Sequence, residues 1–194
     1  MKISPEFTDK NWQDLNLSLD SSEEKWQKAI EIFKDRIKGR FLKPVNLIQE
    51  YEYAGFAVLA LDCLLIETLQ QFREGVPRTP DRQSKTYFVN FLTETSFGFT
   101  KEQAEMFYEQ IRCGILHQAE TKGNSKIRIT SSIPLVQYTD DRKALIINRT
   151  LFHKQLEQEF ESYIKELLNP NNRDLRKNFK KKMDFICRLS AEVD

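Results

Sequence analysis

An arginine and a histidine lie five positions apart in the stretch YEQIRCGILHQAETKG, which runs from Tyr108 to Gly123. Arg112 carries a permanent positive charge on a planar group that fits a phosphate. His117 is one of two histidines in the chain, and histidine changes charge near neutral pH, so it can act as a general acid or base. These two side chains, with no cluster of carboxylates around them, suit metal-independent cleavage of RNA, in which the 2′-hydroxyl attacks the phosphorus.

The spacing of the pair leaves the geometry of such a site open. Five residues of ideal α-helix rotate by about 140°, so Arg112 and His117 do not share one stripe of a helix. Their side chains would converge if the helix were distorted near Gly114. They would also converge if a second copy of the chain brought its own pair across a two-fold axis. The alternative is a structural pair without chemistry, because the bare spacing also occurs by chance.

Three glutamates and a cysteine are candidates to support the Arg112–His117 pair. On proximity alone, the supporting residues are Glu67, Glu109, Glu120 and Cys113. Glu67 and Asp62 interrupt the segment 50–73, which is otherwise apolar nearly all round. Buried carboxylates are rare unless they are paired. Each therefore lies at the edge of a helical bundle or caps a backbone group, or one of them orients Arg112 and His117.

The chain also offers cations for a nucleic-acid backbone. A predicted amphipathic helix over residues 172–190 carries basic residues opposite its apolar face, and the loop after His117 adds one lysine. The candidates for phosphate contacts are Lys122, Arg173, Arg176, Lys177, Lys180 and Lys181. The alternative is a solvated face, which is the usual role of a run of charges. The second histidine, His153, falls in the first turn of its helix, and we interpret it as a surface or capping residue.

The composition excludes several classes of protein. The 194 residues include 30 basic and 29 acidic side chains, so no global field favours nucleic acid or a membrane. Three scattered cysteines lack the spacing of a disulfide framework or a metal site, which indicates a reducing compartment. The longest apolar run, residues 54–66, is too short to cross a bilayer, which takes about 20 residues. We therefore expect a cytoplasmic protein without membrane contact, metal or cofactor.

Hydrophobic periodicity predicts a mainly α protein. Helices are expected in six segments, which are about 22–38, 50–73, 85–95, 101–121, 150–168 and 173–189. Thr100 and Gln103 form a capping-box pattern at the start of the fourth helix, and Gly123 is expected to end it. The quoted stretch is the second half of this helix.

The remaining segments are irregular or extended. Short β-branched stretches predict a small β-hairpin insertion over residues 126–149, with a third strand at about 127–130. Residues 1–20 lack periodicity and are expected to form an irregular arm. Together the elements predict a single domain, residues 1–194, built as an up-and-down helical bundle with a small β-hairpin.

The sequence Arg112-Cys-Gly-Ile-Leu-His117 on a late helix resembles the signature of the HEPN superfamily, which is an arginine followed by four to six residues and a histidine. The resemblance extends over about residues 22–121 and 150–168. It implies an up-and-down helical bundle that pairs as a homodimer. In such families the two Arg–His motifs meet in a cleft between subunits and form a metal-independent endoribonuclease site.

The resemblance also implies partners and a biological setting. Many HEPN members belong to toxin–antitoxin, abortive-infection or other antiviral systems, so RNA and an antitoxin or operon partner are the expected partners. The family usually has a polar residue after the arginine, whereas this chain has Cys113. Other members bind RNA or nucleotides without cutting. The alternatives to a nuclease are therefore a non-catalytic dimeric RNA- or nucleotide-binding or regulatory module, and a purely structural helical partner.

Overall fold

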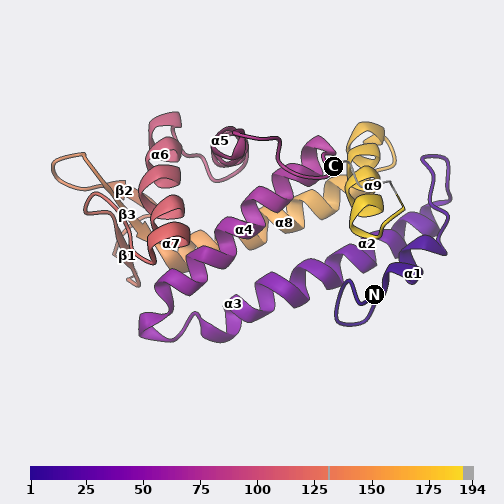
Figure 1. Ribbon diagram of the computed structural model, residues 1–194, viewed down its shortest axis with the longest axis horizontal. Coiled ribbons are helices and arrows are strands. Elements are labelled where there is room, and N and C mark those ends of the chain that lie inside the picture. Colours follow the sequence, from indigo (N-terminus) through magenta and orange to yellow (C-terminus); the bar gives the residue numbers. More distant parts are fainter. Residues whose placement is uncertain (131, 190–194) are drawn as a thin grey trace. The chain divides into compact units, whose positions relative to one another are not determined.

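The computed structural model describes residues 1–130 and 132–189, and it is mainly helical with a small three-stranded sheet (Figure 1). Its elements in chain order are α1 (Asp9–Gln13), α2 (Glu23–Ile37), α3 (Lys43–Ile48), α4 (Gly55–Glu74), α5 (Ser84–Glu94), α6 (Lys101–Met106), α7 (Cys113–Gln118), β1 (Lys126–Arg128), β2 (Val136–Tyr138), β3 (Leu145–Asn148), α8 (Arg149–Leu168) and α9 (Arg173–Ile186). Helices thus lie in each of the six predicted segments. Positions 131 and 190, within the predicted insertion and at the end of the predicted C-terminal helix, lie outside the described residues.

Contacts divide the chain into two compact units. The first comprises Met1–Pro44, Gln71–Thr79 and the chain from Phe160, and the second comprises Val45–Gln70 and Pro80–Glu159. The sequence pattern gives no sign of this division, because helices α4 and α8 run across its boundaries and no linker composition marks them. Arg112 and His117 both belong to the second unit.

The core of the first unit is aromatic. The ring of Phe33 in α2 lies 4.6 Å from that of Phe72, 5.7 Å from that of Phe160 and 5.2 Å from that of Phe179, measured between centroids. All four side chains are fully buried. Tilted and edge-on pairs at these distances add to the stabilisation from buried apolar area. This cluster explains the apolar stripes that the sequence shows along α2 and α9.

The N-terminal segment of the first unit is more ordered than the sequence predicts. Residues 9–13 form α1, in a region expected to be irregular. Trp12 is buried, lies 5.7 Å from Phe179 between ring centroids, and donates a hydrogen bond from Nε1 to Asp184 at 2.9 Å. Burial of one large indole thus orders a segment that is too short to show helical periodicity.

A lysine of α9 is buried in the first unit. Lys182 is 6% exposed, and its ammonium donates to Gln71 Oε1 at 2.6 Å and to the carbonyl oxygen of Pro77. Burial, together with the nearby charges of Arg36 and Arg78, lowers the pKa of Lys182 from 10.5 to about 8. The uncharged amine is therefore favoured in the folded state more than in the unfolded chain.

We expect Lys182→Met to alter the pH dependence of stability. Between about pH 8 and about pH 10.5 the unfolded wild type binds this proton more than the folded protein does, so Lys182 makes stability rise with pH in that window. The difference in free energy of unfolding between wild type and Lys182→Met should shift in favour of the wild type as pH rises. Urea denaturation across this range measures the shift. A difference for Lys182→Met that stays constant with pH would contradict the prediction.

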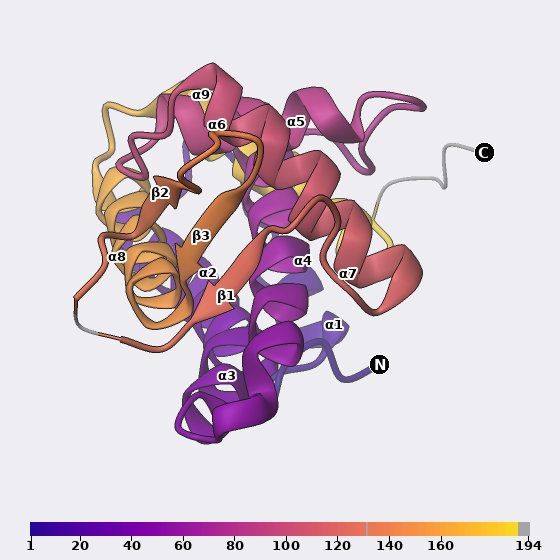
Figure 2. The same ribbon diagram turned by 90° about the vertical axis from the view of Figure 1, so that its left-hand side faces the viewer.

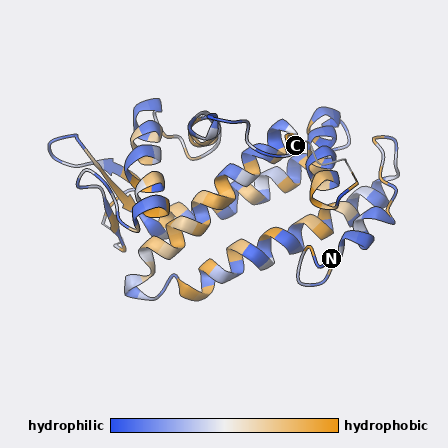
Figure 3. Ribbon diagram, in the orientation of Figure 1, coloured by the Kyte–Doolittle hydropathy of each residue, from blue (hydrophilic) through white to orange (hydrophobic). Residues whose placement is uncertain are grey.

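The second unit has its own aromatic core. The ring of Phe107 lies 5.0 Å from that of Phe152 and 5.7 Å from that of Phe88, stacked in both cases. All three are fully buried. The first half of α4 is mostly apolar, as its sequence predicts, and appears largely orange in Figure 3.

A three-stranded sheet completes the second unit, with strand order β1-β3-β2 (Figure 2). β2 and β3 are antiparallel, with Tyr138 opposite Leu145, which confirms the predicted hairpin. β1 pairs parallel to β3 over Lys126–Arg128, which confirms the third strand. β1 therefore lies at an edge of the sheet, directly after the loop that follows the Arg–His stretch.

Candidate functional site

The helix that carries Arg112 and His117 is distorted before the pair. Its start has the predicted capping box, in which Gln103 N donates to Thr100 Oγ1 at 3.2 Å and Thr100 N donates to Gln103 Oε1 at 3.0 Å. After α6 a π-helical turn covers Phe107–Arg112, and α-helix resumes at Cys113. A distortion near Gly114, which is one way to bring the pair together, is not present: the π-helical turn ends at Arg112, and Cys113–Gln118 is regular α-helix.

The helix ends earlier than the sequence predicts. Its last residue is Gln118, and Ala119 adopts a left-handed conformation with φ of 55°, so Gly123 is not the cap. The chain then folds back over Gly114, where a Cβ would collide with the carbonyl oxygen of Glu120. Glycine at position 114 therefore permits the close approach of this loop, which would have no room beside a larger residue.

Arg112 is held by groups from two other helices. Its Nη2 donates to Glu67 Oε2 of α4 at 3.0 Å and to Ser84 Oγ of α5 at 3.3 Å. The guanidinium carbon lies 5.2 Å from the ring centroid of Tyr108. Burial lowers the pKa of Arg112, but Tyr108 and Glu67 raise it by more, so the net pKa lies above its usual value. The cation is thus anchored through Nη2, whereas Nη1 contacts Cys113 Sγ at 4.0 Å.

His117 is placed differently from its predicted partner. It lies in the last turn of α7 and is exposed. Within the described residues it makes no hydrogen bond, ion pair or ring contact, and none joins it to Arg112. The structure therefore does not assemble the two side chains into one site within a single chain, in agreement with their rotation of about 140° along a helix.

The supporting residues have separate environments. The structure brings only Glu67 and Cys113 to Arg112. Glu109 forms an exposed ion pair with Lys85 at 2.7 Å. Glu120 accepts a hydrogen bond from Thr121 N at 3.0 Å, beyond the helix end. Of the two carboxylates in the apolar helix, Glu67 is the one that orients Arg112, by contact rather than by proximity alone.

The predicted phosphate contacts on α9 belong to the first unit, and one of them must be corrected. Arg176 is 2% exposed and donates to both carboxylate oxygens of Glu23, at 2.8 and 2.7 Å, and to the carbonyl oxygen of Leu167 at 2.9 Å. It also lies over the ring of Trp26, 4.6 Å from its centroid. Arg176 is therefore a structural cation and not a phosphate ligand. The sequence signal for its burial is the spacing of three residues to the buried Phe179, which we interpreted as an exposed basic face instead.

The other predicted cations remain at or near the surface. Arg173 pairs with Asp20 at 2.8 Å, and Lys180 pairs with Asp184 at 2.5 Å. In the described part of the chain, Lys177 and Lys181 are exposed and form no ion pair or hydrogen bond. Lys122 of the second unit is half-buried, and its backbone N donates to the Gln110 carbonyl at 2.8 Å, which holds the loop against the helix.

The interpretation of His153 as a surface residue is wrong. Its ring is 1% exposed, and Nδ1 lies 2.7 Å from Asp62 Oδ1, which is also 1% exposed. His153 Nε2 lies 3.7 Å from Glu157, which is too far for a hydrogen bond. Burial raises the pKa of Asp62, and the hydrogen bond from His153 opposes that rise. The two residues are 91 positions apart, so no local pattern in the sequence could reveal the pair.

Among the residues that the structure describes, no group of three or more histidine, cysteine, aspartate or glutamate side chains is arranged to hold a metal ion. Over residues 1–130 and 132–189, no helix is both long and apolar enough to cross a membrane. Comparison with protein-family models, with curated proteins and with solved structures finds no match to this chain.

Proposed function

We propose that this protein is a metal-independent endoribonuclease of the HEPN type, an up-and-down helical bundle that acts as a cytoplasmic homodimer. In this proposal the β-hairpin is an insertion into the bundle. Arg112 binds a phosphate of the RNA, and His117 is the general acid or base. Because the two side chains of one chain lie on different faces of their helix, a complete site takes residues from both copies across a two-fold axis.

The observation that supports this proposal best is the contrast between the two side chains. Arg112 is anchored by Glu67 and Ser84, so its charge has a defined position, while Nη1 faces no carboxylate among the described residues. His117 is exposed at a helix end and has no partner in the described chain that would occupy its ring nitrogens. A fixed cation and an accessible imidazole are the two groups that phosphodiester cleavage by general acid–base catalysis requires.

The reaction balances with these groups alone. The 2′-hydroxyl loses its proton to one imidazole and attacks the adjacent phosphorus. The bond from phosphorus to the 5′-oxygen breaks, and the leaving oxygen takes a proton from an imidazolium. The products are a 2′,3′-cyclic phosphate and a 5′-hydroxyl. Two copies of His117, one from each subunit, would supply the base and the acid, and Arg112 would stabilise the charge on the phosphoryl oxygens.

A second candidate function is a non-catalytic dimeric module that binds RNA or nucleotides or regulates a partner. One observation favours it: Arg112 already has a carboxylate partner in its own chain, at 3.0 Å. Cys113 supports the same function, because the HEPN family usually has a polar residue after the arginine. In a toxin–antitoxin or antiphage setting, either function would include an antitoxin or operon partner.

The nuclease proposal is tested by incubating the purified protein with RNA of mixed sequence in excess EDTA. We expect cleavage that leaves 2′,3′-cyclic phosphate ends. Absence of cleavage by folded, dimeric protein free of a co-purified partner would contradict the nuclease and favour the binding module.

Arg112 is expected to be needed for rapid cleavage of RNA. Arg112→Ala should lower cleavage about 100- to 1,000-fold, the usual loss when one donor to a developing oxyanion is removed. Arg112→Lys is the matched variant, because it keeps a charge beside Glu67 but loses the planar fork. It should retain the wild-type melting temperature and cleave at an intermediate rate. Wild-type rates for both variants, measured as initial rates on one labelled substrate, would remove Arg112 from the site.

A further inference from the structure

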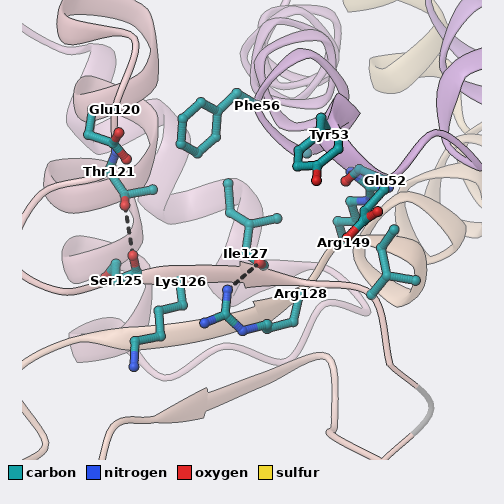
Figure 4. Close-up of a pocket in the computed structure, with 12 residues that line it drawn as sticks. Glu52, Tyr53, Phe56, Glu120, Thr121, Ser125, Lys126, Ile127, Arg128 and Arg149 are labelled. Carbon is teal, nitrogen blue, oxygen red and sulfur yellow. Dashed lines mark hydrogen bonds between the residues drawn. The ribbon is translucent and has the colours of Figure 1, made fainter.

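A pocket lies in the second unit between the start of α4, strand β1 and the loop that follows α7 (Figure 4). Its volume is about 380 Å³, within the usual range of small-ligand sites of about 300–1,000 Å³. Glu120 and Thr121 form one side, only three and four residues after His117. The pocket therefore begins where the candidate catalytic helix ends.

One part of the pocket is aromatic and apolar. Figure 4 shows the side chains of Phe56, Tyr53 and Ile127 directed toward the same space. Tyr53 is 77% exposed, and its ring forms an edge-on pair with that of Tyr51, 5.9 Å apart between centroids, so most of Tyr53 stays accessible to a ligand. Exposed aromatic rings at a pocket are the surfaces on which nucleobases stack, whatever the base.

The pocket also holds positive charge without an ion-pair partner. Arg149 is 1% exposed, and within the described residues its guanidinium donates to carbonyl oxygens, of Gln49 at 3.0 Å, Tyr51 at 2.6 Å and Glu52 at 3.2 Å. Burial lowers the pKa of Arg149, and the charge of Glu50 opposes that shift. Its buried Nε has no hydrogen-bond partner among the described atoms. Carbonyl dipoles stabilise this cation but do not neutralise it, and its field acts through a poorly solvated region.

Two further cations come from the edge strand. Lys126 and Arg128 line the pocket from β1 but alternate with Ile127, so their side chains leave the strand on the opposite face, at the outer edge of the pocket. Arg128 Nη1 donates to the carbonyl oxygen of Ile127 at 3.1 Å. In the part of the chain that the structure describes, neither forms an ion pair. With Arg149 they give three positive charges against the two carboxylates of the lining, Glu52 and Glu120. The lining therefore has an excess of one positive charge, which complements the single negative charge of one phosphodiester.

The walls are held in place before any ligand binds. Thr121 Oγ1 donates to the Ser125 carbonyl at 2.7 Å, and Ser125 Oγ donates to Gln110 Oε1 at 2.7 Å and accepts from Leu145 N at 3.0 Å. These bonds tie the loop to both the helix and the sheet. A preformed wall lowers the ordering cost of binding.

We propose that this pocket is a subsite for one nucleotide of single-stranded RNA. The base stacks on Tyr53 and Phe56, and the phosphate contacts Lys126 and Arg128 at the rim, above the buried charge of Arg149. From this subsite the RNA continues past Glu120 toward His117. The subsite rests on the proposed ribonuclease function, since its role is to position the strand for cleavage.

Binding is measured separately from cleavage, by fluorescence anisotropy of a fluorescein-labelled RNA of about ten nucleotides, with His117→Ala protein so that the probe stays intact. Tyr53→Ala should weaken binding about 5- to 150-fold, the usual loss of one stacking ring. Tyr53→Phe keeps the ring and should bind as the parent protein does. Because Tyr53 is exposed, neither variant should alter the melting temperature.

The cations are tested by salt dependence. The double variant Lys126→Gln/Arg128→Gln should reduce the slope of log K against log salt concentration by about 1.4, for two lost contacts to a single strand. Lys154→Gln, at an exposed lysine of α8 outside the pocket, should leave the slope unchanged.

The outcomes distinguish this proposal from the nuclease itself. If wild-type protein cleaves RNA and Tyr53→Ala binds and cleaves equally well, the subsite is wrong and the nuclease stands. If the variants lose binding as expected but wild-type protein never cleaves, the subsite stands and the nuclease fails. If folded protein does not bind the labelled RNA at low salt, the subsite is overturned directly.

Discussion

His117→Ala is expected to lower the rate of RNA cleavage about 100- to 10,000-fold, the usual contribution of a general acid or base. The free energy of unfolding should change by less than about 0.5 kcal/mol, because the side chain is exposed and forms no hydrogen bond or ion pair with a described residue. Single-turnover cleavage measures the first quantity and urea denaturation the second. This combination identifies a catalytic residue, because substitution of a structural residue would lower the cleavage rate and the free energy of unfolding together.

Two comparisons make the result specific. Gln118→Ala alters the next exposed residue of the same helix and should cleave like wild type. Added imidazole should restore part of the activity of His117→Ala, because a free base can replace the missing proton acceptor, and it should do nothing for Arg112→Ala. Equal cleavage by wild type and His117→Ala would mean that the activity arises elsewhere or from a contaminant.

His153→Leu is expected to lower the free energy of unfolding by about 3–5 kcal/mol. The substitution leaves Asp62, which is 1% exposed, without its 2.7 Å hydrogen-bond partner in the interior of the second unit. Removal of both polar groups, in Asp62→Val/His153→Leu, should recover most of this loss, because the cost comes from the unpaired carboxyl group and not from the missing attraction. A double-mutant cycle by urea denaturation measures both effects.

The loss of stability in His153→Leu should also depend on pH. Burial raises the pKa of Asp62, while His153 holds it down, so His153→Leu raises it further. A carboxyl group with a raised folded-state pKa contributes stability that is present below its unfolded value of 3.8 and is lost as pH rises. The variant should therefore be closer to wild type at about pH 4 than at about pH 7. A deficit of the same size at both pH values, or a double variant as unstable as the single one, would show that Asp62 is not the cause.

The periodic features of this protein follow from its sequence alone. Apolar residues three and four apart predict each long helix, and β-branched residues around Thr139–Lys143 predict the hairpin of β2 and β3. These features are local, since a helix or a tight turn is specified by neighbours within a few residues. The position of Arg112 and His117 on one helix is local in the same sense, as is the capping box at Thr100.

Only the tertiary structure decided which polar groups meet. Arg112 pairs with Glu67 from 45 positions away, and Asp62 pairs with His153 from 91 positions away. Such contacts depend on how helices pack, and many pairings of the same residues agree equally well with the sequence pattern. Sequence proximity therefore failed for Glu109, which lies three residues from Arg112 and pairs with Lys85 instead.

The basic residues of α9 also show which properties follow from the sequence and which depend on packing. The sequence predicts a basic helix over residues 172–190, and the structure has α9 at Arg173–Ile186, but packing separates the exposed Lys177 and Lys181 from the buried Arg176 and Lys182. Burial of a cation depends on partners supplied by distant segments, such as the carboxylate of Glu23. Charge and periodicity are properties of the chain, whereas desolvation and pairing are properties of the packed molecule.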